Sequence, residues 1–303
     1  LMNHPAPSKA VRILVTGASG FIGRHLVEAL SPDSAAIGRN LPDFTVCNPA
    51  AAKAVVADLA PAAVVHLAGL LGNVGSDNTR ELFETNFVGT LNMLEACRWG
   101  GVKTFLLASS LTVHGTNTPE EPNVLSSPFR PIHAYGASKA AAEFALQEYA
   151  RRFGMATVAL RPTIVLGDTE MPNAASEFVA SLLRGEDAVI YGTGEHEREW
   201  TWVSDVAAGF RRGLEFALAG GSGYHPFFLS GNRIAMRDLA RLATEKVGGR
   251  VKFLPSSAKA FTLTADTAAS NAALGWAPAV SLSEMIDRLI TIRRGKAAAG
   301  GGA

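Results

Sequence analysis

A short apolar strand followed by three evenly spaced glycines constrains the fold of this chain most strongly. Residues 11–15 are strand formers, Gly17, Gly20 and Gly23 follow at G-x-x-G-x-x-G spacing, and a segment with helical periodicity comes next. In this order the glycines permit a tight turn, close approach of backbone N–H groups to a pyrophosphate, and close packing of helix on strand. We therefore predict a dinucleotide-binding turn with phosphate at the helix N-terminus, the alternative being a purely structural glycine turn.

Three later apolar runs predict further strands of the same kind. Residues 63–68, 104–109 and 156–161 are nearly unbroken apolar stretches, separated by helical patterns around 81–99 and 137–153. Such strands indicate a parallel sheet that is covered by helices on both faces. We predict an α/β protein with a doubly wound parallel sheet of the Rossmann type and a smaller C-terminal α/β substrate lobe.

The pattern becomes irregular after Gly167, and the 303 residues leave room for a second domain. The lobe is expected to contain helices at 174–183, 236–247 and 282–293. The expected boundaries are a dinucleotide-binding domain at 11–165 completed by about 199–225, a substrate lobe at 166–198 and 226–295, and flexible tails at 1–10 and 296–303.

The composition is that of an ordinary globular protein. Hydrophobic residues make up 48% of the chain, charged residues make up 18%, and the formal net charge is +1. This balance gives no electrostatic reason to expect a nucleic acid or an anionic membrane as a partner. The chain has no apolar run of about 18 residues and no signal-peptide core at its start, so we expect a cytoplasmic protein that does not enter a membrane.

We expect neither a metal nor a disulfide. Cys47 and Cys97 cannot form a disulfide framework or a C-x-x-C metal site. His196, with Glu195 and Glu197 on either side, lacks the i, i+4 ligand spacing of a metal-binding helix. The glutamates of the charged run 195–199, Glu199 among them, are expected to be solvated.

Small and polar residues follow two of the predicted strands. The carboxyl ends of parallel strands meet at one edge of a sheet, and ligands bind there in this fold class. Leu67, Ala68 and Gly69 come at the end of one strand, where the backbone can pass close to a bound ring. Ser110 and Thr112 follow the next strand. A serine in this place is usually a cap, but at this edge we predict that Ser110 binds substrate and shares a proton with it.

Tyr135 and Lys139 form a pair on an Ala-rich segment of high helix propensity. Their spacing of four residues places both side chains on one face, one turn apart. A phenol has an ordinary pKa near 10, and an adjacent ammonium favours the phenolate. We predict an acid–base pair; the alternative is an unrelated Tyr and Lys on a surface helix.

The second predicted strand, at 34–39, ends in Arg39. An acidic residue here would bind the ribose hydroxyls of NAD, whereas an arginine can accommodate the 2′-phosphate of NADP. The cofactor is therefore expected to be NAD or NADP, with a slight preference for NADP.

Several segments match the landmarks of one family. They are 16–23 (T-G-x-x-G-x-x-G), 65–69 (H-L-A-A), 86–90 (N-x-x-G-T), 109–115 (S-S-x-x-V-Y-G), 135–139 (Y-x-x-x-K), 160–162, 192–198, 203–207 and 274–278. In these the chain resembles the extended short-chain dehydrogenase/reductases, the NAD-dependent epimerase/dehydratase family. The resemblance covers nearly the whole chain.

The resemblance implies roles for individual residues. It assigns catalysis to Ser110, Tyr135 and Lys139, and substrate binding to Ser110, Thr112 and Arg198, the last of these at a nucleotide-sugar phosphate. With the residues named above, the expected cofactor-binding set is Gly17, Ser19, Gly20, Phe21, Ile22, Gly23, Arg39, Leu67, Ala68, Gly69, Asn86, Tyr135 and Lys139.

The resemblance favours a sugar-nucleotide epimerase. Dehydratases of the family have Asp-Glu after the catalytic Ser or Thr, and Leu111-Thr112 stands here instead, which argues against a 4,6-dehydratase. His114 occupies a position where tyrosine is usual. A keto-sugar reductase or a sugar or hydroxy-compound dehydrogenase of the family is the alternative, and a non-catalytic dinucleotide-sensing module is an alternative of another class. Family members often form homodimers through two long helices, here 81–99 and 137–153.

Overall fold

The computed structural model describes residues 11–30, 34–40, 42–71, 78–168, 172–257 and 260–300. The chain divides into two compact units. The first unit comprises Leu1–Ser109, His133–Leu160 and Phe210–Pro226, and the second comprises Ser110–Ile132, Arg161–Gly209 and Phe227–Ala303. The second unit therefore includes 110–132, 161–165 and 199–209, which the sequence pattern had placed in the dinucleotide-binding domain.

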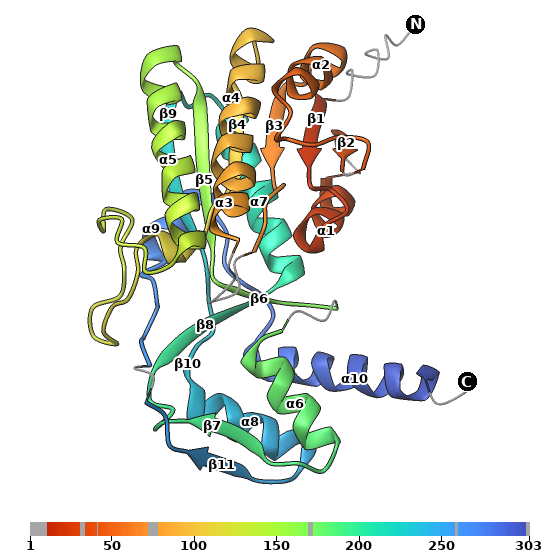
Figure 1. Ribbon diagram of the computed structural model, residues 1–303, viewed down its shortest axis with the longest axis vertical. Coiled ribbons are helices and arrows are strands. Elements are labelled where there is room, and N and C mark those ends of the chain that lie inside the picture. Colours follow the sequence, from red (N-terminus) through yellow and green to blue (C-terminus); the bar gives the residue numbers. More distant parts are fainter. Residues whose placement is uncertain are drawn as a thin grey trace, which may run out of the picture. The chain divides into compact units, whose positions relative to one another are not determined.

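A six-stranded sheet forms the centre of the first unit (Figure 1). Its strand order is β2-β1-β3-β4-β5-β9, and the pairings from β2 through β5 are parallel. The strands are β1 (Val11–Thr16), β2 (Ser34–Arg39), β3 (Ala63–His66), β4 (Thr104–Ala108), β5 (Ala156–Pro162) and β9 (Gly223–Leu229). This order, with the first strand inside and the chain winding outwards in both directions, confirms the predicted α/β fold of the Rossmann type.

Helices pack on both faces of this sheet. They are α1 (Phe21–Leu30), α2 (Pro49–Leu59), α3 (Thr79–Phe83), α4 (Gly89–Trp99), α5 (Ala134–Phe153) and α7 (Val203–Leu218). The single helix expected at 81–99 consists of α3, a π-helical segment η1 (Glu84–Val88) and α4. Helix α2 was not predicted, although Asn48 caps it by accepting from the N–H groups of Ala50 and Ala51 and proline stands at its start.

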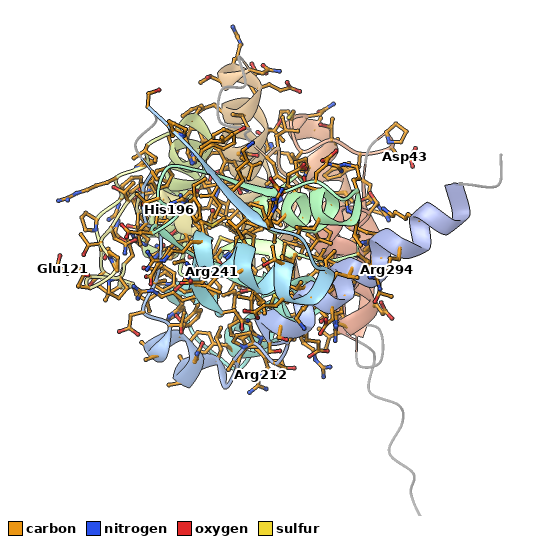
Figure 2. The ribbon with its side chains drawn as sticks, turned by 90° about the horizontal axis from the view of Figure 1, so that it is seen from below. Asp43, Glu121, His196, Arg212, Arg241 and Arg294 are labelled. Atoms are coloured by element: carbon orange, nitrogen blue, oxygen red, sulfur yellow. The ribbon has the colours of Figure 1, made fainter. Side chains whose placement is uncertain are left out.

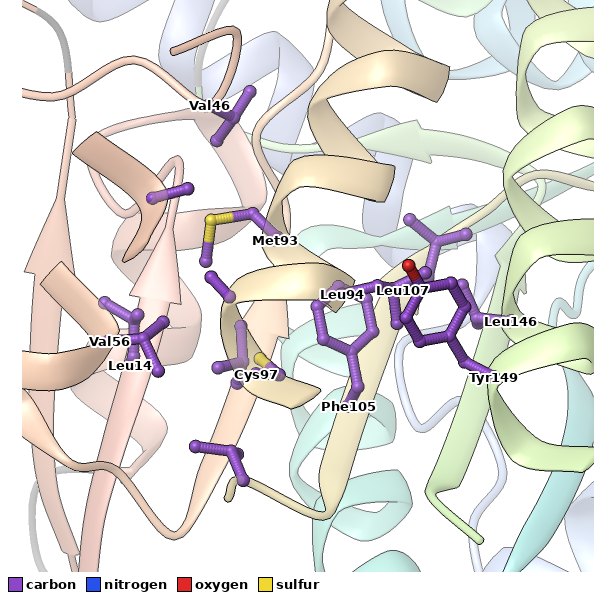
Figure 3. Close-up of a cluster of buried hydrophobic side chains, with 14 of the residues drawn as sticks. Leu14, Val46, Val56, Met93, Leu94, Cys97, Phe105, Leu107, Leu146 and Tyr149 are labelled. Carbon is purple, nitrogen blue, oxygen red and sulfur yellow. The ribbon is translucent and has the colours of Figure 1, made fainter. Parts of the chain in front are cut away.

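The core of the first unit lies between the sheet and helices α2, α4 and α5 (Figure 3). Alternate strand residues face this cluster, and strand residues between them face the opposite side, where Gly213 of α7 lies against Leu160. The strands are therefore buried on both faces, as their unbroken apolar sequence predicts. The clustered side chains include Leu14, Val56, Val64, Met93, Leu94, Phe105, Leu107 and Leu146.

The second unit contains two small sheets and four α-helices among its described residues. One sheet has the order β10-β8-β6 and the other pairs β11 with β7. The elements are η2 (Leu111–Val113), β6 (Ile164–Leu166), α6 (Ala174–Leu183), β7 (Ala188–Tyr191), β8 (Glu197–Trp202), β10 (Arg233–Ala235), α8 (Met236–Val247), β11 (Val251–Leu254), α9 (Ala268–Leu274) and α10 (Leu282–Gly300), with α7 beginning here. Charged side chains such as Arg241 of α8 and Arg294 of α10 lie at its surface (Figure 2).

Two predictions about the chain ends have different outcomes. Helix α10 continues to Gly300, so residues 296–300 are helical and not the flexible tail that was predicted. The reason is that alanine has the highest helix propensity, and three alanines follow Lys296. Residues 1–10 and 301–303 lie outside the described part of the chain. Across the ranges that the structure describes, no helix combines the length and hydrophobicity needed to cross a bilayer.

Candidate functional site

The glycine turn after β1 brings three backbone segments into close contact. Gly17 has φ +70° and its N–H donates to the carbonyl of Arg39 at 3.0 Å. A Cβ atom at Gly17 would lie 2.7 Å from the Ala68 nitrogen, and one at Gly23 would lie 2.1 Å from the Gly17 oxygen. No side chain fits at either position. Ser19 and Gly20 are exposed at the start of α1, with their N–H groups bound by the Asn40 side chain and the Gly17 carbonyl, and a pyrophosphate fits beside a helix N-terminus of this kind.

Further predicted cofactor residues surround this turn. Phe21 and Ile22 are half-buried in the first turn of α1, and the Leu67 N–H donates to the Thr16 carbonyl at 3.1 Å. Arg39 is half-buried and donates to its own neighbour, the Gly38 carbonyl, at 3.0 Å. The sequence did not indicate Asn40, whose side-chain oxygen accepts from the Ser19 N–H at 2.8 Å.

Asn86 fixes the backbone that follows β3. It lies fully buried in the π-helical segment η1, a type of insertion that often occurs at functional sites. Its side-chain oxygen accepts from the Leu70 N–H at 2.8 Å, and its nitrogen donates to the Leu70 carbonyl and to the Ser138 hydroxyl, both at 3.0 Å. These contacts engage the Asn86 amide with the chain itself. Asn86 thus positions the loop of Gly69 against α5.

Lys139 is buried beside that loop. Its ammonium donates to the Ala108 carbonyl at 2.9 Å, and a Cβ atom at Gly69 would lie only 3.1 Å from Lys139 Nζ. Burial lowers the pKa of Lys139 to about 8, although the charge of Glu143 acts in the opposite direction. Lys139 Nζ lies 5.9 Å from the ring centroid of the half-buried Tyr135. The structure therefore brings the predicted amine and phenol together at the edge of the sheet where the glycine turn lies.

Ser110 and Thr112 belong to the second unit. Ser110 is the N-cap of η2, and its hydroxyl oxygen accepts from the N–H of Thr112 at 3.2 Å and from the hydroxyl of Thr112 at 2.9 Å. The capping role that serine usually plays at such a position is therefore present. The three predicted catalytic residues are divided between the two units, with Tyr135 and Lys139 in the first.

The model of the NAD dependent epimerase/dehydratase family matches residues 13–225, more than half of the chain. The chain belongs to this family. The predicted family is thereby confirmed, and its cofactor is NAD.

The proteins that are similar to this chain have several different activities. The chain is 32% identical to D-erythronate dehydrogenase of Haemophilus influenzae over 63% of its own length and 64% of that protein. It is 29% identical to UDP-glucose 4-epimerase of Mycolicibacterium smegmatis, over 94% of the chain and 99% of that protein. The solved structure of the Thermus thermophilus UDP-glucose 4-epimerase in complex with NAD is similar with a TM-score of 0.81, at 26% identity, over 94% of this chain and 99% of that one. The last two of these likenesses run along nearly the whole chain.

Helix α5 is capped by a histidine that the sequence did not indicate. His133 is the N-cap, and its Nδ1 accepts from the Gly136 N–H at 3.1 Å. Its ring centroid lies 6.2 Å from that of Tyr135. Ser, Thr, Asp and Asn are the usual caps, so histidine gave no capping signal in the sequence.

His114, which departs from the family pattern, contacts a buried arginine. His114 Nε2 lies 2.8 Å from Nη1 of Arg161, and its Nδ1 lies 3.3 Å from the Pro128 carbonyl. A guanidinium only donates, so Nε2 of His114 accepts and the proton belongs on Nδ1. The rings of Phe129 and Phe228 flank the guanidinium at 5.4 and 5.6 Å. His114 is thus a neutral partner for a charge that is almost fully buried.

Arg198 and Glu199 are neighbours on β8 of the second unit, the first half-buried and the second buried. The half-buried Arg198 donates to the carbonyls of Phe261 and Glu197 and lies 4.3 Å over the Phe261 ring. Glu199 was expected to be solvated, but it is 4% exposed, and its carboxylate accepts from the Ser230 hydroxyl at 2.5 Å and the Ala265 N–H at 3.1 Å. Strand β8 is buried without interruption from Glu199 to Trp202, which the charge pattern alone concealed. Among the described residues, no group of three His, Cys, Asp or Glu side chains could hold a metal ion.

The buried His66 is expected to make the stability of the protein depend on pH. It is fully buried at the end of β3, with Nδ1 2.8 Å from the Thr16 hydroxyl, and burial together with the charge of Lys139 lowers its pKa to about 3. Between that value and the ordinary pKa of 6.5 the unfolded chain binds more protons, so the free energy of unfolding falls as the pH falls. From pH 7 to pH 5 this amounts to about 2 kcal/mol, at about 1.4 kcal/mol per pH unit below 6.5.

The measurement is urea denaturation of the wild type and of His66→Gln at pH 7 and pH 5. We expect the wild type to lose about 2 kcal/mol more than the variant over this interval. Equal losses in the two proteins would show that His66 does not titrate in this way.

Proposed function

We propose that the chain is an NAD-dependent epimerase that acts on a nucleotide-activated sugar by transient oxidation and re-reduction. The observation that carries the proposal is the buried Lys139, held on the Ala108 carbonyl beside Gly69 and the Tyr135 ring. The likeness to the Mycolicibacterium smegmatis UDP-glucose 4-epimerase, which covers nearly all of both chains, supports the substrate class.

In the proposed reaction, Tyr135, Lys139 and Ser110 have separate roles in proton transfer. Bound NAD would supply the acceptor, and later the donor, of a hydride at a substrate carbon. Tyr135 removes the proton of the hydroxyl on that carbon and later gives it back, and the Lys139 ammonium favours the phenolate that this requires. Lys139 keeps N–H groups beyond the one that meets Ala108, and these are proposed to bind the nicotinamide ribose. Ser110 already accepts two hydrogen bonds from Thr112, which leaves its own proton for the reacting oxygen.

A dehydrogenase or reductase of the same family is the second candidate. Two observations favour it. The chain is 32% identical over 203 residues to a D-erythronate dehydrogenase, and Arg39 ends β2 where an acidic residue would favour NAD over NADP. In that case the product leaves after a single hydride transfer, oxidised by a dehydrogenase or reduced by a reductase, and the cofactor is exchanged in each turnover.

Mass spectrometry of small molecules released from the denatured protein separates the two candidates. We expect retained NAD and, in a companion assay, interconversion of UDP-glucose and UDP-galactose without added cofactor. Protein that is purified free of dinucleotide, and that consumes added NAD or NADPH with a hydroxy or keto substrate, contradicts the epimerase and supports the second candidate.

We also propose that two copies pair through the helical face of α4 and α5. Trp99 and Phe144, which are large and apolar, are 67% and 59% exposed on these helices. Exposed apolar side chains mark interaction surfaces where they gather into a patch, and the family resemblance places the pairing on these two helices. The Phe144→Asp variant is expected to shift the protein from dimer to monomer in light scattering, whereas Tyr191→Asp, at a residue equally exposed in the second unit, is expected to leave the dimer intact. A wild type that is monomeric at micromolar concentration contradicts the proposal.

A further inference from the structure

Glu143 is a buried carboxylate that the proposed reaction does not use. It lies on α5 and is 0% exposed. One carboxylate oxygen accepts from the hydroxyl of Ser109, at the end of β4, and the other accepts from the hydroxyl of Tyr224 on β9. Three elements distant in sequence thus hold this side chain in one place. The two hydroxyl donors fix the position of this carboxylate inside the protein.

This carboxylate lies one helical turn from Lys139. Residues four apart on a helix are neighbours on one face, so Tyr135, Lys139 and Glu143 follow each other along α5. The end of β4 binds both charged groups, since the carbonyl of Ala108 accepts from the Lys139 ammonium at 2.9 Å and the next residue, Ser109, donates to Glu143. Lys139 itself is 4% exposed. An ammonium this deeply buried is costly unless a counter-charge is near.

The other groups that face Lys139 cannot supply that counter-charge. On β3, His66 is neutral at physiological pH because its pKa is lowered to about 3. Gly69 and Ala108 present only backbone to the ammonium. Tyr135, the one other titratable group on this face of α5, is the phenol whose proton is to be exchanged. Of the charges that act on Lys139, Glu143 is the one that favours the ammonium form, whereas burial opposes it.

We propose that Glu143 is a positioning residue that keeps Lys139 in its ammonium form, through a carboxylate fixed by Ser109 and Tyr224. Its effect on catalysis rests on the proposed function, because the Lys139 ammonium matters there for the phenolate of Tyr135. Its effect on Lys139 does not, because the lysine can be titrated in the absence of substrate and turnover.

The test is an NMR titration of protein labelled with ¹³C-lysine, with the Lys139 signal assigned by comparison with Lys139→Arg. In the wild type we expect a midpoint at about 8 or above. A midpoint of about 5–6, as found for buried lysines without a partner, would overturn the proposal even if no variant folds. In Glu143→Gln, which keeps the shape and one acceptor, we expect the midpoint to fall by at least about one pH unit.

The matched control is Ser109→Ala, which removes a donor to the same carboxylate but leaves its charge. Both variants are expected to unfold at a lower temperature than the wild type, because each weakens the same buried network. Only Glu143→Gln is expected to move the Lys139 midpoint. If Glu143 has only a structural role, the midpoint of the Lys139 titration stays in place in both variants. That result also overturns the proposal.

The pH dependence of kcat is a second test of the proposal. If the chain is an epimerase, the alkaline limb of its pH profile of kcat is expected to move to lower pH in Glu143→Gln. The limb is expected to stay in place in Ser109→Ala. If the wild type turns over no nucleotide sugar, the proposed function fails, whereas the lysine titration still decides the role of Glu143.

Discussion

Replacement of Tyr135 by phenylalanine is expected to lower kcat by about 10³-fold, the size of a lost general acid–base contribution. The variant keeps the ring that lies 5.9 Å from Lys139 Nζ and removes the hydroxyl alone. Because Lys139, Gly69 and the glycine turn are untouched, NAD affinity is expected to stay within about twofold of the wild type, which corresponds to less than about 1 kcal/mol. Loss of turnover without loss of NAD binding would show that the variant is folded and that only its catalytic step is impaired.

The measurement is kcat with a nucleotide sugar, together with NAD binding by calorimetry. Tyr191→Phe is the matched control, since Tyr191 is 64% exposed and belongs to the second unit. We expect the control to keep wild-type turnover. If Tyr135→Phe remains active, another group exchanges the proton, and the assignment of Tyr135 is wrong.

The second large effect is expected from Gly23→Ala. The added Cβ would lie 2.1 Å from the Gly17 oxygen and 2.8 Å from the Ala18 Cα, and both are backbone atoms that cannot rotate away. The start of α1 must move away from β1 to admit the methyl group, so the N–H groups at its N-terminus no longer point at a pyrophosphate. We expect NAD binding to weaken by at least about tenfold, or about 1.4 kcal/mol, and stability to fall by about 1–3 kcal/mol from overpacking.

Gly295→Ala makes the same chemical change where there is space. Gly295 lies inside α10, and nothing lies within 4 Å of the position that a Cβ atom would occupy there. Alanine stabilises a helix interior by about 0.5–1 kcal/mol relative to glycine, so this variant is expected to be at least as stable as the wild type and to bind NAD equally well. Calorimetry and thermal unfolding report both quantities. A Gly23→Ala protein that binds NAD like the wild type would contradict the proposed pyrophosphate site.

Local patterns in the sequence were sufficient for the parts of the fold that depend on neighbouring residues. The order of β1, glycine turn and α1 follows from a strand run and glycine spacing, and the strand β2 and the helix α6 lie where the pattern predicted them. The spacing of Tyr135 and Lys139 placed both on one face of α5, because helix geometry alone determines which residues are neighbours. The π-helical segment around Asn86 could not be predicted, because it accompanies contacts with Leu70 and Ser138 that are distant in sequence.

By itself the sequence determined the doubly wound sheet, the glycine turn, the Tyr135–Lys139 pair and, through its motifs, the family. Only the tertiary structure decided what surrounds that pair. Lys139 meets Ala108 across 31 positions, and Glu143 meets Ser109 across 34 and Tyr224 across 81. Burial and long-range partners set the charge of a side chain, and neither is encoded in the few residues on either side of it.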